Sequence, residues 1–142
     1  MTLLFGCDPE VFVKRRGRKF FHSAYGLNKG TKEAPVRVDK GAVQVDGMAL
    51  EFNIDPAATV DEWYGNINCV LKQLAASVPQ FEIVPVPVAH FTKAHMAKQP
   101  YEAIELGCTP DFNAWKGGEE NPRPDGSAVL FRTGAGHIHF GW

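Results

Sequence analysis

Alternating apolar and polar residues on both sides of Asp46-Gly47 constrain the fold more than any other part of the chain. An Asp-Gly pair between two such runs is a strong signal for a two-residue β-hairpin loop. With Asp46 and Gly47 as the loop, Val45 would face Met48 and Ala42 would face Glu51. One face of the hairpin would then be apolar and the other polar, because side chains alternate along a strand. The apolar set is Val43, Val45, Met48, Leu50, Phe52 and Ile54, and the polar set is Gln44, Glu51 and Asn53.

The segment from Val60 to Val78 is the clearest helix in the sequence. Thr59 and Glu62 have the spacing of a capping box, and Pro79 ends the helix. Apolar residues recur at helical spacing along one side, a pattern more typical of a core-facing stripe than of a cofactor contact. We therefore predict an α+β fold, in which a curved antiparallel sheet packs its apolar face against this one long helix.

Two further segments place polar side chains at alternate positions. Asp8 and Glu10 lie near the start of the chain, and His137 and His139 lie near its end. Alternate side chains of an extended strand share a face, so the intervening Ile138 and the following Phe140 should point into the core. Taken alone, the histidines also fit a half-buried strand, while a turn position before Pro9 and a solvated strand position are the simpler interpretations of Asp8 and Glu10. If all three segments join one sheet, however, its open face carries three carboxylates beside two imidazoles.

Carboxylates gathered on one face repel one another unless a cation lies among them. Oxygen ligands with one or two imidazoles suit Mg²⁺ or Mn²⁺ better than zinc. Mg²⁺ held by few carboxylates commonly acts together with substrate phosphates, so nucleotide chemistry is expected. A zinc hydrolase built on His137, His139 and a carboxylate is a less favoured alternative, because the sequence has no His-Glu-x-x-His spacing.

Composition narrows the class of protein. The 142 residues suit a single domain, residues 1–142, and 44% hydrophobic with 22% charged residues is an ordinary globular balance. The net charge of −1 gives no electrostatic reason to expect nucleic acid or a membrane as a partner. Three cysteines without CxxC spacing argue against a disulfide framework and a structural zinc site, and favour the cytoplasm.

Four segments share their order and their polar residues with one known family: Gly6–Phe12, Gly41–Asn53, Glu105–Asp111 and Arg132–His139. In these segments the chain resembles the phage-encoded COOH-NH2 ligases of type 2, within the glutamine synthetase and glutamate–cysteine ligase superfamily. The resemblance implies a glutamine synthetase-like sheet whose open face binds ATP and two divalent cations. It also implies that a carboxylate attacks the γ-phosphate and that an amine then displaces the acyl phosphate to form an amide.

Site residues follow from the resemblance position by position. The acids near the start and the acid after the Gln-containing strand would bind Mg²⁺ or Mn²⁺, and the Gly-x-His-x-His stretch would touch metal and nucleotide phosphate. Gln44 and Asp46 are weaker candidates. The implied metal ligands are Asp8, Glu10, Glu51 and His137, the implied ATP contacts are His139, Arg132 and Gln44, and the implied catalytic residues are Arg132 and Glu51.

Members of this family are expected to be longer, with further strands and ligands after the His-x-His strand. The resemblance therefore implies that residues 1–142 form the N-terminal portion of a catalytic domain, completed by a C-terminal half or by a partner subunit in a homo-oligomer. The expected substrates are a small-molecule or peptide carboxylate and an amine, in the host cytoplasm if the protein is phage-encoded. The alternative is a non-catalytic metal-binding or interaction module that keeps the ligase scaffold.

Overall fold

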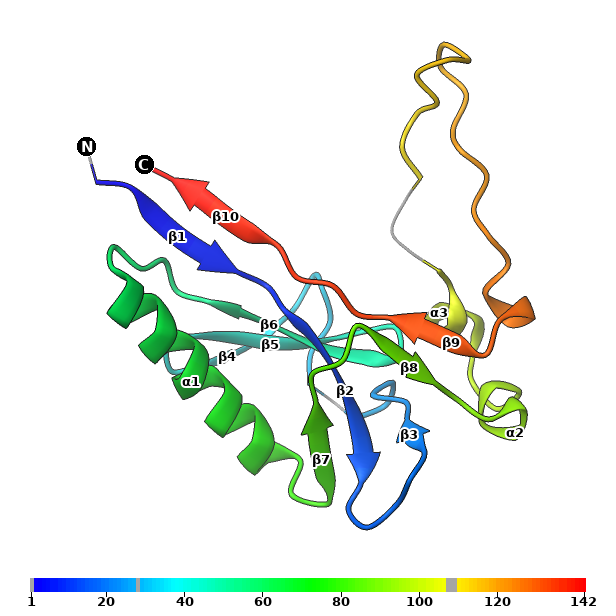
Figure 1. The fold of residues 1–142 in the computed structure, drawn as a ribbon, viewed down its shortest axis with the longest axis horizontal. Helices are drawn as coiled ribbons and strands as arrows, with labels where there is room; N and C mark the ends of the chain where they lie inside the picture. The colour runs from blue at the N-terminus through cyan, green and yellow to red at the C-terminus, as the bar shows by residue number, and fades with distance from the viewer. Residues whose placement is uncertain (1, 28, 107–109) are drawn as a thin grey trace.

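The structure, a computed structural model, describes residues 2–27, 29–106 and 110–142. It is a mixed α and β fold with antiparallel sheets and few helices (Figure 1). The elements, in chain order, are β1 (Leu4–Cys7), β2 (Glu10–Arg15), β3 (Phe21–His22), β4 (Val36–Val38), β5 (Gly41–Asp46), β6 (Ala49–Ile54), α1 (Val60–Ser77), β7 (Phe81–Val84), β8 (Val88–His90), α2 (Lys93–Met96), α3 (Tyr101–Ile104), a 3₁₀ turn (Gly126–Ala128), β9 (Phe131–Thr133) and β10 (Ile138–Gly141).

Helix α1 begins where the capping signal predicts. The Thr59 side chain accepts a hydrogen bond from the backbone N–H of Glu62 at 3.2 Å, and the Glu62 carboxylate accepts one from the N–H of Ala58 at 2.9 Å. These two bonds satisfy donors that a helix N-terminus otherwise leaves unpaired. The helix packs on β5, β6 and β7. None of the helices in the described ranges has the length and apolar character needed to cross a lipid bilayer.

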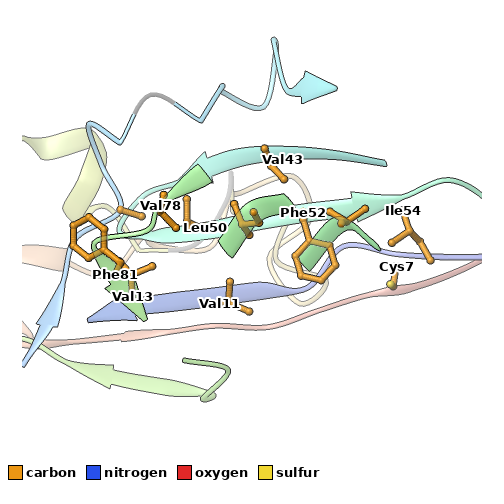
Figure 2. Packing of buried hydrophobic residues seen from close by; sticks show 12 residues of the cluster. Cys7, Val11, Val13, Val43, Leu50, Phe52, Ile54, Val78 and Phe81 are labelled. Carbon is orange, nitrogen blue, oxygen red and sulfur yellow. The ribbon is translucent and has the colours of Figure 1, made fainter. Parts of the chain in front are cut away.

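The largest sheet has the order β3-β2-β6-β5-β4, and β7 pairs with the remaining part of β2. Its α1-facing side forms the main core, where Val11, Val43, Leu50 and Phe52 pack together with α1 (Figure 2). Burial of these apolar side chains stabilises the fold at about 25 cal/mol per Å² of apolar area. Helix α1 therefore covers this apolar face of the sheet.

The loop of the central hairpin lies one residue further along the chain than predicted, which shifts each cross-strand partner by two residues. The loop is Gly47-Met48, so that Asp46 pairs with Ala49, Val45 with Leu50 and Gln44 with Glu51. Gly47 has a φ of +54°, at the first loop position, where type II′ hairpin turns place glycine. The predicted loop of Asp46 and Gly47 was wrong because it treated Asp46 as a turn residue. Asp46 is instead the last residue of β5.

A second apolar cluster covers part of the face opposite α1. Phe12, Met48 and Ala49 are buried against residues of β8, α2 and α3. Met48 therefore belongs to this second cluster and not to the α1-facing core, contrary to the predicted face assignment. The polar residues of the hairpin lie beside this cluster, so they line a partly enclosed surface instead of an open sheet face.

The two ends of the chain form a separate ribbon in place of the single curved sheet that the sequence predicted. β1 pairs antiparallel with β10, and β8 pairs with β9, as two further two-stranded sheets. Pro9 has no N–H to donate, so regular pairing stops between β1 and β2. Isolated backbone bonds still join the segments, from Asp8 N to His137 O and from Glu10 N to Ala135 O. Ile138 and Phe140 are exposed, so the prediction that they enter the core was wrong.

Candidate metal centre

Three carboxylates converge on the face of the main sheet that lies away from α1. Glu10 on β2 is directly opposite Glu51 on β6, and Glu51 is directly opposite Gln44 on β5. Asp46 lies two residues beyond Gln44 and therefore on the same face. One oxygen from each of Glu10, Asp46 and Glu51 lies within 4.8 Å of the other two. We call these three residues the acidic triad.

A buried amide holds one member of the acidic triad in place. Gln44 is buried, and its Nε2 donates a hydrogen bond of 2.8 Å to Glu51 Oε2. Because a buried polar group needs a partner, this bond restricts the rotation of both side chains. Gln44 thus positions Glu51, and its expected contact with a nucleotide stays a prediction.

The electrostatics of the acidic triad are unfavourable for three ionised carboxylates. Burial raises the pKa of Glu10, and the neighbouring charges of Asp46 and Glu51 raise it further. Burial also raises the pKa of Glu51, with the charge of Asp46 acting in the same direction, against the Gln44 hydrogen bond. Like charges directly opposite in a sheet destabilise it. The triad is therefore a place where a cation would lower the free energy of the folded chain.

Lys32 supplies one positive charge at the edge of the acidic triad. Its Nζ lies 2.7 Å from Asp46 Oδ2, and this hydrogen bond raises the pKa of the Lys32 amine, as do the charges of Glu51 and Glu10. Both side chains of this ion pair remain partly exposed to solvent. One ammonium cannot neutralise three carboxylates, so the triad keeps a net negative charge.

Asp8 binds both tail histidines instead of joining the acidic triad. Its Oδ1 accepts a bond of 2.8 Å from the backbone N–H of His137 and lies 3.1 Å from His137 Nδ1, while Oδ2 lies 3.2 Å from His139 Nε2. Burial alone would raise the pKa of Asp8, but these bonds together hold it below its usual range. The two imidazoles are largely exposed, and both contact the Asp8 carboxylate, which is not part of the acidic triad.

Two adjoining cavities surround these groups. The first, of about 540 Å³, is lined by the acidic triad together with Asp8, Gln44 and His137. The second, of about 940 Å³, shares Lys32, Asp46 and Glu105 with the first and extends toward Tyr25 and Lys29. Lys32 therefore lines both the cavity that holds the acidic triad and the larger cavity, whose lining residues carry charges of both signs.

Arg132 is placed differently from the sequence expectation. It is buried, and its Nη1 and Nη2 donate to the backbone carbonyls of Val129, Phe131, Ile104 and Gly126 at 2.6–3.3 Å. Its Nε has no partner within the described residues. The guanidinium thus ties β9 to the end of α3 and to the 3₁₀ turn. Its expected role in phosphate binding stays a prediction, and its hydrogen bonds favour a structural role.

The structure brings together some of the predicted site residues and separates others. Glu10 and Glu51 meet directly, whereas Asp8, His137 and His139 form a neighbouring group. Sequence reasoning ranked Asp46 as a weaker candidate and placed it in the hairpin loop, whereas Asp46 ends β5 and joins the acidic triad. The position of Lys32 at the acidic triad could not be predicted, because its irregular loop has no spacing that points to the site. The Glu105–Asp111 motif falls partly at residues 107–109, which lie outside the described residues.

Comparisons with protein-family models, with curated protein sequences and with solved structures found no match to this chain. The ligase resemblance therefore stays a prediction, and the case for function depends on the geometry of the acidic triad and its surroundings.

Proposed function

We propose that the protein is an ATP- and Mg²⁺-dependent carboxylate–amine ligase, or the N-terminal part of one, built on a glutamine synthetase-like sheet. The observation that supports this most is the convergence of Glu10, Asp46 and Glu51, whose oxygens lie within 4.8 Å of one another. These residues come from three strands and from two distant parts of the chain. Tertiary folding thus assembles a group that costs free energy while it lacks a cation.

The donor set of the acidic triad fits Mg²⁺ or Mn²⁺. Both ions prefer oxygen ligands, and Mg²⁺ is often held by one or two carboxylates while substrate phosphates complete its coordination. No histidine joins the triad within the described residues, which disfavours zinc. A bound divalent cation would neutralise phosphate charge, and Glu10, Asp46 and Glu51 would hold it.

The remaining groups suit a phosphate-bearing substrate beside the cation. Lys32 lines both cavities and could pair with an anion in the larger one. A positive charge held near a transferring phosphoryl group stabilises the charge that develops there. His137 and Asp8 line the same cavity as the acidic triad, and His137 Nδ1 lies 3.1 Å from Asp8 Oδ1. The two cavities together leave room for a nucleotide and a second substrate.

Calorimetric titration tests this proposal. Mn²⁺ should bind the wild-type chain, and ATP should bind more tightly in the presence of Mn²⁺ than in EDTA. Glu51→Gln should lose metal binding while keeping the Gln44 hydrogen bond, because glutamine also offers an oxygen acceptor. Glu82→Gln is the matched control, since Glu82 is an exposed residue of β7 outside the acidic triad. No binding of ATP at millimolar concentration, with Mn²⁺ present, would contradict the ligase proposal.

One observation favours a second candidate, a metal-binding interaction module without ligase activity. The Arg132 guanidinium already donates to four backbone carbonyls, so it offers little to a phosphate. The same titrations separate the two candidates. Mn²⁺ binding that depends on Glu51, together with no ATP binding and no ADP release from ATP with mixed amino acids, would favour the module.

A further inference from the structure

Two histidines from distant parts of the chain meet where β3 lies against α2. The ring centroids of His22, the last residue of β3, and His95, in α2, are 5.2 Å apart, and the rings cross edge to face. The ring of His95 also stacks on Phe91, with centroids 5.7 Å apart and planes 12° from parallel. The two imidazoles lie outside the candidate metal centre, since neither lines the two cavities around it.

One hydrogen bond between these segments requires a neutral imidazole. The backbone N–H of Ser23 donates to His95 Nε2 at 3.0 Å. A backbone amide can only donate, so Nε2 must present its lone pair and cannot carry a proton. His22 Nδ1 lies 2.8 Å from the carbonyl oxygen of Ser23, so that nitrogen is the donor. Ser23 is buried, and loss of the His95 acceptor would leave its N–H unpaired inside the protein.

The surroundings of His95 also disfavour an imidazolium. Burial lowers the pKa of His95, and the positive charges of His22 and Lys98 lower it further. No carboxylate of the described residues is among the groups that shift this pKa. On the β2 side of β3, the Lys14 ammonium lies 4.3 Å from the ring centroid of Phe21 and adds another positive charge to this part of the molecule. Only the ring face of Phe91 favours a cation at His95.

We propose that the hydrogen bond from Ser23 to His95 is a pH-sensitive latch between β3 and α2. The latch is closed while His95 is neutral. Protonation of Nε2 turns the acceptor into a second donor that faces the Ser23 N–H, so the latch opens. Ser23 is also the first residue of the connection to β4, whose Tyr25 and Lys32 line the larger cavity. The latch therefore holds the start of that cavity wall against α2.

Linkage gives the sign of the pH effect. The open latch leaves an imidazole of ordinary pKa, about 6.5, whereas the pKa of His95 is lowered while the latch is closed. The open state therefore binds more protons, and the latch loses stability as the pH falls below about 6.5. The fraction open should rise about 10-fold for each pH unit between the two pKa values and then level off.

The glutamates of the acidic triad act with the opposite sign, because their pKa values are raised in the folded chain. The effect of the latch on global unfolding cannot exceed the free energy of opening the latch itself. A measurement at single residues is therefore needed to separate the two effects.

Amide hydrogen exchange, followed by NMR on the full chain from about pH 7.5 to about pH 5, tests the proposal. After correction for intrinsic exchange, the Ser23 amide should lose protection on acidification. The Phe52 amide, which donates to Pro9 O beside the main core, should keep it. His95→Gln keeps an acceptor that does not titrate and should make Ser23 protection independent of pH. His90→Gln is the matched control, since it removes an exposed histidine of β8 and should preserve the wild-type pH dependence.

Several results would overturn the proposal. They are Ser23 protection that does not change with pH in the wild type, an equal fall in His95→Gln, parallel loss at Phe52, or loss of the pH dependence in His90→Gln. If His95→Gln folds poorly, NMR titration of the wild-type imidazole decides instead. A His95 pKa at or above about 6.5 would contradict the latch, and a lower value would support it.

Discussion

Replacing Glu51 by glutamine should stabilise the metal-free protein at pH 7. In the wild type, Glu51 is directly opposite Glu10 and also faces Asp46. Glutamine keeps the shape of the side chain and can still accept the hydrogen bond from Gln44 Nε2. The substitution thus removes charge repulsion with little loss of packing. Most substitutions at partly buried positions destabilise a protein, so a gain in stability is a distinctive outcome.

The size of the gain follows from the triad geometry. The triad oxygens lie within 4.8 Å of one another, and two unit charges at that outer limit interact by about 3.5 kcal/mol at an effective dielectric constant of roughly 20. Partial exposure to solvent and the Lys32 ammonium both reduce this value. We expect a net gain of about 1 kcal/mol in the free energy of unfolding, which corresponds to roughly 4 °C in Tm for a chain of this size.

The pH dependence has a definite sign. The pKa values of Glu10 and Glu51 are raised in the folded chain, so the folded state binds more protons than the unfolded state near those values. Stability must therefore fall as the pH rises from the ordinary glutamate pKa, about 4.3, through the raised values. The wild type without metal should be more stable at pH 5 than at pH 7, and Glu51→Gln should show a smaller difference.

Urea unfolding at pH 5 and pH 7, with EDTA or with Mn²⁺, measures these effects. Mn²⁺ at 100 times its dissociation constant should stabilise the wild type by about 2.7 kcal/mol and leave Glu51→Gln unchanged. Glu82→Gln should behave as the wild type in all four conditions. A Glu51→Gln variant that is less stable than the wild type at pH 7, yet keeps its stabilisation by Mn²⁺, would refute the electrostatic reasoning.

Three further substitutions probe other parts of the structure. Thr59→Ala removes the acceptor for Glu62 N–H and should cost about 1 kcal/mol in urea unfolding, with Thr31→Ala as a control in an exposed loop. Asp8→Asn should reduce the stability lost on acidification below about pH 4, because a lowered carboxylate pKa stabilises the fold only above its ordinary value; an unchanged acid limb in a pH titration would contradict this. Arg132→Met should lower the free energy of unfolding by about 3 kcal/mol or more, since it leaves four carbonyls without their donor. An Arg132→Met protein of wild-type stability that has lost ATP binding would instead support the phosphate role.

Local patterns in the sequence were sufficient for the separate elements. The capping residues Thr59 and Glu62 and the apolar stripe that follows them specify α1, because both signals act within a few residues of one another. The alternation on either side of Gly47 specifies the hairpin faces. It left the position of the loop open by one residue, because Asp46 is chemically suited to a turn and to a strand end alike. Only the pairing of Asp46 with Ala49 removes that ambiguity.

Only the tertiary structure shows which residues form the candidate site. That acids would gather on one sheet face could be read from the polar pairs at Asp8 and Glu51. Which acids gather depends on where Pro9 interrupts pairing, since that break sends Asp8 to the histidines while Glu10 joins the acidic triad. Lys32 reaches Asp46 from an irregular loop, and Arg132 turns into the protein to meet backbone carbonyls. Sequence periodicity contains no information about such contacts, because they join segments whose spacing along the chain is arbitrary.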